Sequence, residues 1–587
     1  MRSTLSSCPL NLPAEKPRLL FGKENLEAIR SRADDTFRQQ LRADCDEIMS
    51  KPPEEVQSRN ASYLSSPAKR AAEGFLILRE DRYADWARGR IKALLGLTSW
   101  MGAVHESLCE RCDHVMANTA ADLVYAHDLL GDAVDEEFTA RFWEGLRKLH
   151  MEPYLAAARN RDEFWSRDNY LANWKIMTHG ESGFALCGFA NQWPDAREAL
   201  LLAAEGVLEI LDIIPPEGDW PEGVGYWYAT LFLGLRFALA LRRLTAGAVD
   251  LLSHPRLNAT GDFGTALISP GGKAFNYGDN KVTINGNCST ALLLLGREKD
   301  RPDWVGAARK FPAATPLWLH LDEPGIADQV PENGTRHFPA SGVATMRRDS
   351  TFLAMRSGNS TVGHAHLDSN SFVLETAGVT LLKDEGHWPY AHFLGFFDRG
   401  KGYGGLRWNF DAIDTIGHNA ILVDGQGQAH GGDYAGCLET ATEGDRWMRL
   451  EGEASACYPG LLKKWRRTLL LCEEEALVIR DVIRCDGERH VEWLLHSDAE
   501  FRDDRDDTIL RREGLRARLV ALLPDRSQGW RVSEVRRQSV YENSNTGEIE
   551  RPAIRYRSFA PFRAADSCEF LFLLLLDDSQ SVDFSFD

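Results

Sequence analysis

The texture of the sequence changes near residue 340, and this change constrains the fold more than any single motif does. Before it, apolar residues recur at steps of three and four, as on one face of an amphipathic helix. After it, short apolar runs alternate with polar turns such as Asp424-Gly425 and Asp486-Gly487, a pattern typical of antiparallel strands. The sequence therefore predicts a multidomain α+β chain that is helical first and all-β second.

The helical half runs from residue 18 to about 310, with apolar residues spaced for one long first helix at Leu26, Ile29, Ala33, Phe37, Leu41, Cys45 and Ile48. Further helices are expected near 67–97, 115–130, 135–150, 171–190, 196–213 and 224–247. Many helices of similar length favour an (α/α) toroid or a helical array. No fixed-period repeat is visible, which makes a solenoid the weaker interpretation.

The β half shows strand-like runs at 351–356, 371–375, 420–423, 468–472, 476–479, 490–495 and 570–576. They predict a layered antiparallel β-sandwich. The Pro-rich stretch 312–339 marks the boundary, so we expect an (α/α) toroid at 1–330 and a β-sandwich at 331–587. The loop 385–417 is rich in Gly and aromatic residues, and long loops inside compact domains usually serve function.

Composition excludes some functional classes. The 587-residue chain carries a net charge of -19, which argues against nucleic acid as a partner. We expect no membrane partner, because no hydrophobic run is predicted to approach the length of about 20 residues that a membrane-spanning helix needs. No signal peptide is visible, which predicts a cytoplasmic protein, or a secreted or periplasmic one if a signal segment has been removed. The 11 scattered cysteines fit reduced thiols better than a disulfide framework.

A candidate metal site is spread over three segments of the β half. His366 belongs to the run Gly-His-Ala-His-Leu-Asp-Ser-Asn at 363–370, Asp384 follows as an isolated acid, and His418 lies in Gly-His-Asn at 417–419. Imidazole and carboxylate are common ligands of zinc-like ions, and the separation suits a site assembled by folding. The alternative is a set of histidines with ordinary hydrogen bonds.

A second constellation lies in the helical half. Asn173-Trp174 and His179 share one helical pattern, and Gly218–Tyr228 forms a glycine-punctuated, aromatic-rich entry to the next helix. Aromatic rings beside carboxylates and amides are a common way to hold sugar rings. The alternative is a packed helix start in which Trp220 and Trp227 belong to the core.

Together these segments resemble the heparinase II/III-like polysaccharide lyases. The resemblance rests on the order of short motifs along nearly the whole chain: Pro-Arg-Leu-Leu-Phe-Gly at 17–22, Asn173-Trp174 with His179, Trp-Pro-Glu-Gly-Val-Gly-Tyr at 220–226, the 363–372 run, Asp384, 417–419 and Glu-Trp-Leu-Leu-His at 492–496. The resemblance implies an N-terminal (α/α) toroid followed by an antiparallel β domain. It also implies β-elimination at a uronate, which leaves an unsaturated uronate end.

The resemblance assigns roles to individual residues. Tyr226 matches the catalytic tyrosine, as general acid and, for syn elimination, also as base. His179 matches the catalytic histidine, and Asn173 matches the amide that neutralises the uronate carboxylate. His364 is a further catalytic candidate. Tyr403 lies between Asp384 and His418 in the sequence, where some members of the family have a second active-site tyrosine.

The resemblance also implies a ligand set. The metal position is His366, Asp384 and His418, with zinc favoured and manganese as the alternative. Expected substrate contacts are Glu181 (which could instead orient His179), Trp220, Glu222, Arg399, Lys401, Arg407 and Trp408. The expected partner is an acidic polysaccharide or oligosaccharide such as heparan sulfate, chondroitin sulfate, hyaluronan or alginate. A homodimer is also expected.

Two other functions remain open from the residues alone. A toroid glycoside hydrolase would use a carboxylate pair, for which Asp219 and Glu222 are the candidates. A catalytically inactive glycan-binding protein would retain the site without turnover.

Overall fold

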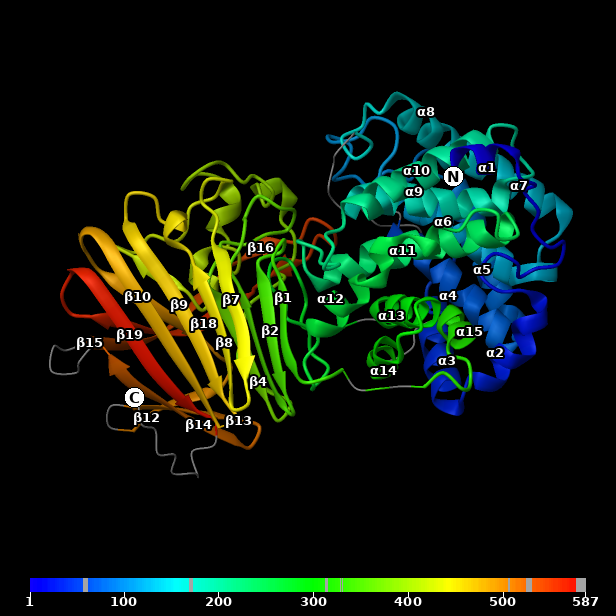
Figure 1. Ribbon diagram of the computed structural model, residues 1–587. Coiled ribbons are helices and arrows are strands. Elements are labelled where there is room, and N and C mark those ends of the chain that lie inside the picture. Colours follow the sequence, from blue (N-terminus) through cyan, green and yellow to red (C-terminus); the bar gives the residue numbers. More distant parts are fainter. Residues whose placement is uncertain are drawn as a thin grey trace. The chain divides into compact units, whose positions relative to one another are not determined.

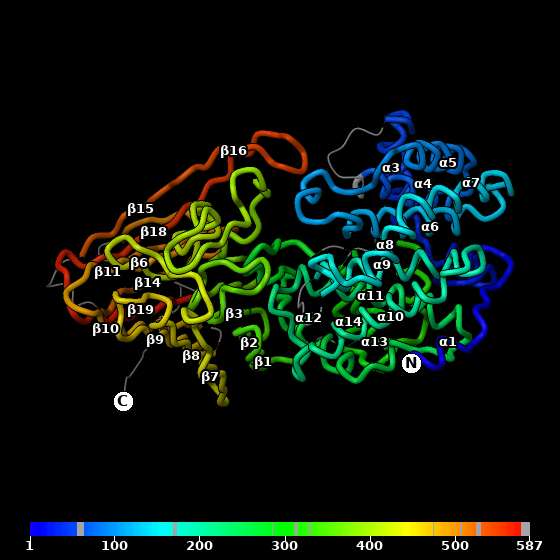
Figure 2. The backbone as a smooth tube through the Cα atoms, turned by 90° about the horizontal axis from the view of Figure 1, so that it is seen from above, coloured from blue at the N-terminus to red at the C-terminus, as the bar shows by residue number. Residues whose placement is uncertain are grey.

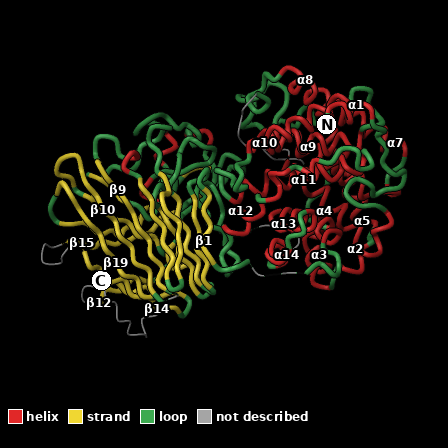
Figure 3. Tube along the Cα trace, viewed as in Figure 1, coloured by secondary structure: helices red, strands yellow, loops and turns green. Residues whose placement is uncertain are grey.

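The computed structural model describes residues 1–55, 62–167, 173–284, 286–311, 315–327, 329, 331–473, 475–504, 507–523 and 530–576. Figure 1 shows helices in the N-terminal part of the chain and strands in the C-terminal part, and Figure 3 colours the two kinds of element separately. This order confirms the predicted α+β organisation.

The chain divides into two compact units. The first comprises Met1–Gly218, Trp227–Gly261 and Asn285–Val330, and the second comprises Asp219–Tyr226, Asp262–Ile284 and Pro331–Asp587. Two segments of the N-terminal half, 219–226 and 262–284, thus belong to the second unit. The sequence prediction had placed both in the helical domain.

The α-helices have the following bounds: α1 Arg2–Ser7, α2 Leu26–Arg32, α3 Asp35–Met49, α4 Ser62–Leu78, α5 Asp81–Leu95, α6 His114–Leu130, α7 Glu136–Leu146, α8 Glu152–Asn160, α9 Asn173–Phe189, α10 Ala196–Ile213, α11 Val224–Leu244, α12 Thr260–Ala266, α13 Gly286–Glu298, α14 Pro302–Arg309 and α15 Pro316–Leu321. The single helix expected from Leu26 to Ile48 is wrong. Asp34 accepts a hydrogen bond from the backbone N–H of Phe37 and so caps a new helix, α3.

α9 and α11 show how the helical unit is filled. Nearly every side chain of α9 is buried, as in a helix surrounded by others. α11 is long and apolar enough to cross a membrane by length and composition, contrary to the expectation from sequence, but 72% of its apolar window is buried inside the protein. A core helix that is mostly buried meets the same criteria of length and composition.

The strands are β1 Gly334–Phe338, β2 Val343–Arg348, β3 Thr351–Arg356, β4 Ser371–Thr376, β5 Val379–Leu382, β6 Ile421–Val423, β7 Cys437–Gly444, β8 Trp447–Glu453, β9 Leu462–Cys472, β10 Ala476–Arg489, β11 Val491–His496, β12 Glu500–Asp504, β13 Asp507–Arg512, β14 Leu515–Leu523, β15 Trp530–Gln538, β16 Tyr541–Glu542, β17 Ile549–Glu550, β18 Ala553–Pro561 and β19 Ala565–Leu575.

Antiparallel pairing joins the strands into layers. A five-stranded sheet runs β1-β2-β3-β4-β5, an eight-stranded sheet runs β12-β13-β14-β19-β10-β9-β8-β7, and a four-stranded sheet runs β15-β18-β11-β6. The neighbouring strands β10, β9, β8 and β7 can be followed in Figures 1 and 2. One core contains buried side chains from all three sheets, including Leu353, Trp465 and Trp493. β3 and β4 are buried along their whole length, so the segments that leave their ends are anchored to a packed core.

Candidate functional site

Two connections of the sheet unit carry its chemistry. The β3–β4 connection, 357–370, holds His364 and His366. The long β5–β6 connection carries Asp384, two residues after the end of β5, and then Tyr390, Arg407 and His418. Since β3, β4 and β5 are neighbours in one sheet, these side chains are supported by one framework.

Tyr226 packs against His364 within this unit. The two rings are nearly parallel, at 11°, with centroids 3.8 Å apart. The hydroxyl of Tyr226 hydrogen-bonds to the hydroxyl of Tyr390, and Tyr390 Oη lies 3.3 Å from His364 Nδ1. Burial, the neighbouring Tyr390 and the charge of Asp279 raise the pKa of Tyr226 well above its usual value. The phenol is therefore protonated at neutral pH, which suits a proton donor.

His364 has an unusual backbone conformation. Its φ is 60°, in the left-handed region that few side chains adopt. Its carbonyl accepts a hydrogen bond of 2.9 Å from the N–H of Asp279, and a Cβ at Gly278 would lie only 2.6 Å from that carbonyl oxygen. The close backbone approach thus requires Gly278. Strained backbone of this kind is often found at functional sites.

Asp279 lies behind His364 and is fully buried. Its Oδ2 is 3.1 Å from His364 Nδ1 and 2.9 Å from Arg407 Nη2, and its Oδ1 is 2.9 Å from His366 Nε2. Burial alone would raise the pKa of Asp279, but the Arg407 charge and the two histidine hydrogen bonds hold it well below its usual value.

Glu222 closes another side of His364. Its Oε1 lies 3.8 Å from His364 Nε2, and its Oε2 accepts a 3.0 Å hydrogen bond from Trp220 Nε1. A Cβ at Gly363 would lie 2.1 Å from Oε1, so Gly363 makes room for the carboxylate. Trp220 is buried, and its indole orients Glu222.

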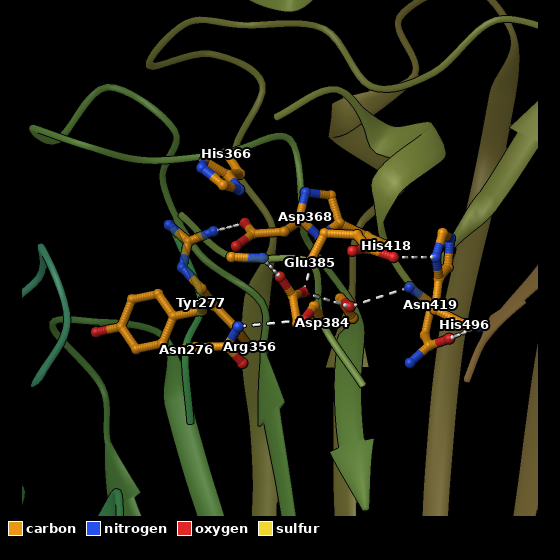
Figure 4. A network of polar contacts seen from close by, with 12 residues as sticks. Asn276, Tyr277, Arg356, His366, Asp368, Asp384, Glu385, His418, Asn419 and His496 are labelled. Atoms are coloured by element: carbon orange, nitrogen blue, oxygen red, sulfur yellow. Dashed lines mark hydrogen bonds and ion pairs between the residues drawn. The ribbon is translucent and has the colours of Figure 1, made fainter. Parts of the chain in front are cut away.

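His366, Asp384 and His418 form a metal-capable triad. Their ligand atoms all lie within 4.8 Å of one another, and all three residues are buried. His418 Nδ1 is 2.8 Å from Asp384 Oδ2, and burial lowers the pKa of His366 to about 4, which keeps its ring neutral. Figure 4 shows the three side chains converging from separate segments.

The triad fits a divalent cation. Among the described residues, His366 Nδ1 and His418 Nε2 are buried nitrogens without a hydrogen-bond partner. Two imidazole lone pairs and one carboxylate form a common zinc ligand set. His366 Nε2 hydrogen-bonds to Asp279, as metal-binding histidines usually do through their second nitrogen.

His179 has a different environment, in the helical unit. Its Nδ1 lies at a hydrogen-bond distance of 2.9 Å from Tyr154 Oη, and its ring meets Trp165 edge-on. A Cβ at Gly206 of α10 would lie 2.2 Å from the imidazole, so the ring is packed between helices. Burial lowers the pKa of His179 to about 3, against an ordinary 6.5.

Asn173 and Glu181 also lie in the helical unit. Asn173 is buried at the start of α9. Glu181 forms a buried ion pair with Arg236, and burial raises its pKa to about 7 despite that charge. Their expected roles at the substrate stay predictions.

The remaining substrate-contact candidates divide by exposure. Arg407 and Trp408 are buried: Arg407 pairs with Asp279, and Trp408 Nε1 donates to the carbonyl of Arg399. Arg407 thus organises the site from inside rather than facing solvent. Arg399 donates to two carbonyls of the β3–β4 connection, and Lys401 is 72% exposed beside Asp433.

The hydroxyl partner of Tyr226 is Tyr390. Tyr403 is 44% exposed and lies near Tyr434 and Cys457, and its role as a second active-site tyrosine stays a prediction. Sequence reasoning also missed Asp279. Two signals could have found these residues: Asp279 follows a glycine in Tyr-Gly-Asp-Asn at 277–280, and Tyr390 shares the Gly- and aromatic-rich loop that was already suspected.

Comparisons with known proteins agree with this architecture. Residues 330–563 match the family model described as Heparinase II/III-like, C-terminal. Among curated proteins, none matches the sequence.

Solved structures give the fold of the whole chain. Heparinase III is 13% identical with a TM-score of 0.62, over 87% of this chain and 76% of that one. A mutant of the heparan sulfate lyase HepC from Pedobacter heparinus is 13% identical with a TM-score of 0.59, over 89% and 77%. Chondroitin AC lyase from Streptomyces coelicolor, in complex with chondroitin sulphate, is 13% identical with a TM-score of 0.58, over 94% and 82%. The chain therefore has the toroid and β-sandwich fold of these proteins, and residues 330–563 are similar to the Heparinase II/III-like, C-terminal family model.

Proposed function

We propose that this protein is a polysaccharide lyase that cleaves uronate-containing glycans by β-elimination. The observation that carries the proposal is the stacked pair of Tyr226 and His364, with the Tyr226 hydroxyl hydrogen-bonded to Tyr390. The shared fold of heparinase III and chondroitin AC lyase supports the same reaction class.

Tyr226 is the general acid in this proposal. Its raised pKa keeps the phenol protonated, so it can donate to the O4 atom that leaves the uronate. If the Tyr390 hydroxyl donates to Tyr226 Oη, the proton of Tyr226 is free to point at the leaving oxygen. The same pKa shift argues against a resting phenolate, and therefore against Tyr226 as the initial base.

His364 is the general base. Its Nδ1 faces Asp279, a carboxylate that only accepts hydrogen bonds, so the proton resides on Nδ1 and the lone pair on Nε2. The side chain is 13% exposed, and Nε2 is the nitrogen assigned to receive the C5 proton of a uronate. Neutralisation of the uronate carboxylate by Asn173 stays a prediction, as does any part that His179 plays.

The cation held by His366, Asp384 and His418 is proposed to be zinc, with manganese as the alternative. When bound, it would fix the β3–β4 and β5–β6 connections together. The proton transfers themselves are assigned to Tyr226 and His364.

The substrate is proposed to be an acidic glycosaminoglycan. One protein of similar fold is a heparan sulfate lyase, and another is a chondroitin AC lyase. Lys401 and Arg399 on the β5–β6 connection are the candidates to contact sulfate or carboxylate groups.

The hydrolase alternative finds less support. Asp219 is fully buried, and its Oδ2 accepts a 2.7 Å hydrogen bond from the N–H of Ser341. A carboxylate used in this way does not serve as one of two acids that flank a glycosidic bond.

An ultraviolet time course tests the proposal. The enzyme would be incubated with heparan sulfate, chondroitin sulfate, hyaluronan and alginate, each beside Tyr226→Phe. Rising absorbance from the C4=C5 double bond on at least one glycan, reduced about 10²- to 10⁴-fold in the variant, is the expected result. New reducing ends without this absorbance would instead mean hydrolysis.

Tyr125→Phe is the matched control. The Tyr125 hydroxyl is buried without a hydrogen-bond partner among the described residues, so its removal breaks no hydrogen bond there. Wild-type activity in this variant would show that losing a buried tyrosine hydroxyl does not in itself inactivate the protein.

A further inference from the structure

Asp279 connects the two functional clusters of the sheet unit. One carboxylate oxygen is 2.9 Å from His366 Nε2, in the metal-capable triad. The other is 3.1 Å from His364 Nδ1, which stacks on Tyr226. A single buried side chain therefore contacts both a proposed base and a proposed metal ligand.

Arg407 holds this carboxylate in place. Its Nη2 donates to Asp279 Oδ2 at 2.9 Å and to the carbonyl of Ala365 at 3.0 Å, and its Nη1 donates to the carbonyl of Phe396 at 3.1 Å. The guanidinium is fully buried and also lies near the rings of Phe396 and Phe397. Arg407 thus links Asp279 to the backbone of Ala365, the residue between His364 and His366.

The contacts determine the tautomers of both rings. An ionised carboxylate has no proton to give, so each histidine nitrogen that faces Asp279 must carry its own. The lone pairs are then on His364 Nε2 and His366 Nδ1. His366 Nδ1 is buried without a hydrogen-bond partner among the described residues, as a nitrogen available to a cation would be.

We propose that Asp279 is a positioning residue shared by the elimination site and the cation site, so that one substitution at Asp279 impairs both. The elimination part of this inference rests on the proposed function, whereas the cation part does not. A carboxylate that serves only one histidine would leave the other site intact when it is replaced.

Asp279→Asn is the test, because it keeps the shape but replaces one acceptor oxygen with a donor amide. The affinity for zinc, measured by competition with a chromogenic chelator and without glycan, is expected to fall by about 10- to 100-fold. On the preferred glycan, kcat is expected to fall by a similar factor of about 10 to 100 with little change in KM. Imidazole nitrogen chemical shifts of His364 and His366 should change from one tautomer each to mixtures.

Asp481→Asn is the matched control. Asp481 is also fully buried, pairs with Arg467 at 2.9 Å and accepts hydrogen bonds from Trp465 and Trp493, but it lies in the sandwich core. It should lower the melting temperature. Because Arg467 also donates to the carbonyl of Asn419, next to His418, any loss in zinc affinity or kcat should be smaller than with Asp279→Asn. If Asp279→Asn does not fold, Arg407→Lys gives the second test, with smaller losses in both zinc affinity and kcat.

The outcomes separate the two ideas. Loss of zinc affinity with unchanged kcat, or the reverse, would overturn the shared role of Asp279, as would wild-type protein that binds no zinc. Wild-type protein that binds zinc but gives no ultraviolet product on any glycan would refute the proposed function alone. The glycan-free zinc and tautomer measurements would then still decide whether Asp279 orients His366 and His364.

Discussion

His179 and His364 are both histidines and both catalytic candidates from sequence, but their surroundings in the two units of the molecule differ. In the helical unit, His179 shares a hydrogen bond with buried Tyr154, and its ring fills the space left by Gly206. In the sheet unit, His364 stacks on Tyr226 and contacts three polar partners: Tyr390, Asp279 and Glu222.

The difference teaches that surroundings, rather than residue type, decide what a histidine can do. A ring enclosed by apolar atoms stays neutral and contributes to packing. A ring with a carboxylate on one nitrogen and an accessible lone pair on the other can move a proton. The predictions below test this contrast.

Replacing the two histidines should give the largest contrast in activity. We expect His364→Ala to lower kcat by about 10²- to 10⁴-fold, because it removes the proposed base. The loss from His179→Ala should be at least about tenfold smaller than the loss from His364→Ala. Initial rates of the ultraviolet assay measure both, and the opposite order would restore the sequence-based assignment of His179.

The pH dependence of stability should separate the same two residues. Burial lowers the pKa of His179 to about 3, whereas an unfolded chain protonates this ring near 6.5. Between these values the unfolded state binds a proton that the folded state does not, so the free energy of unfolding falls as pH falls, by up to about 1.4 kcal/mol per pH unit.

His179→Leu lacks this proton-binding site. The stability difference between wild type and His179→Leu should therefore shrink as pH falls from 6.5 towards 3, as measured by urea unfolding at several pH values. A difference that does not vary with pH would mean that His179 is not held neutral in the folded protein.

Zinc should stabilise the sheet unit through the His366, Asp384 and His418 triad. Free zinc at 100 times its dissociation constant would raise the free energy of unfolding by about 2.7 kcal/mol. Thermal unfolding with zinc and with a chelator measures this change, and His418→Ala should abolish it. An equal zinc effect in wild type and His418→Ala would place the cation elsewhere.

Replacing the two tyrosines of the β5–β6 connection should give the smallest difference in kcat. Tyr390→Phe removes the hydroxyl that contacts Tyr226, and one hydrogen bond of about 1.4 kcal/mol corresponds to about a tenfold loss in kcat. Tyr403→Phe should cost less, because Tyr403 is half-exposed and has Tyr434 and Cys457 as its neighbours. A larger loss from Tyr403→Phe would favour the tyrosine chosen from sequence.

Some strand positions could be predicted because periodicity and turns are local, whereas the runs 468–472, 476–479 and 570–576 cover only parts of β9, β10 and β19. The run 351–356 coincides with β3, and 371–375 and 490–495 lie within one residue of β4 and β11. Helix boundaries were less accessible: the expected helix at 67–97 is α4 and α5, divided at Arg79 and Glu80, where Arg79 has a positive φ of 62°.

The candidate site could be predicted only in part. His366, Asp384 and His418 come together as expected, on connections whose ends are anchored by strands of the packed framework. The contact of Asp279 with His364 could not be foreseen, since the two residues lie 85 positions apart in sequence and their contact depends on the tertiary fold. The burial of His179 could not be predicted either, because Gly206, which makes room for its ring, lies on another helix.

The mass of the glycan product tests the central claim most directly. β-Elimination breaks the C4–O4 bond without adding water, so the fragment with the new non-reducing end should be one water lighter than the corresponding hydrolysis product. We predict this lighter, ultraviolet-absorbing fragment with wild type and Tyr125→Phe, and its loss with Tyr226→Phe. A fragment that carries the added water, or a lighter fragment formed equally well by Tyr226→Phe, would contradict the account.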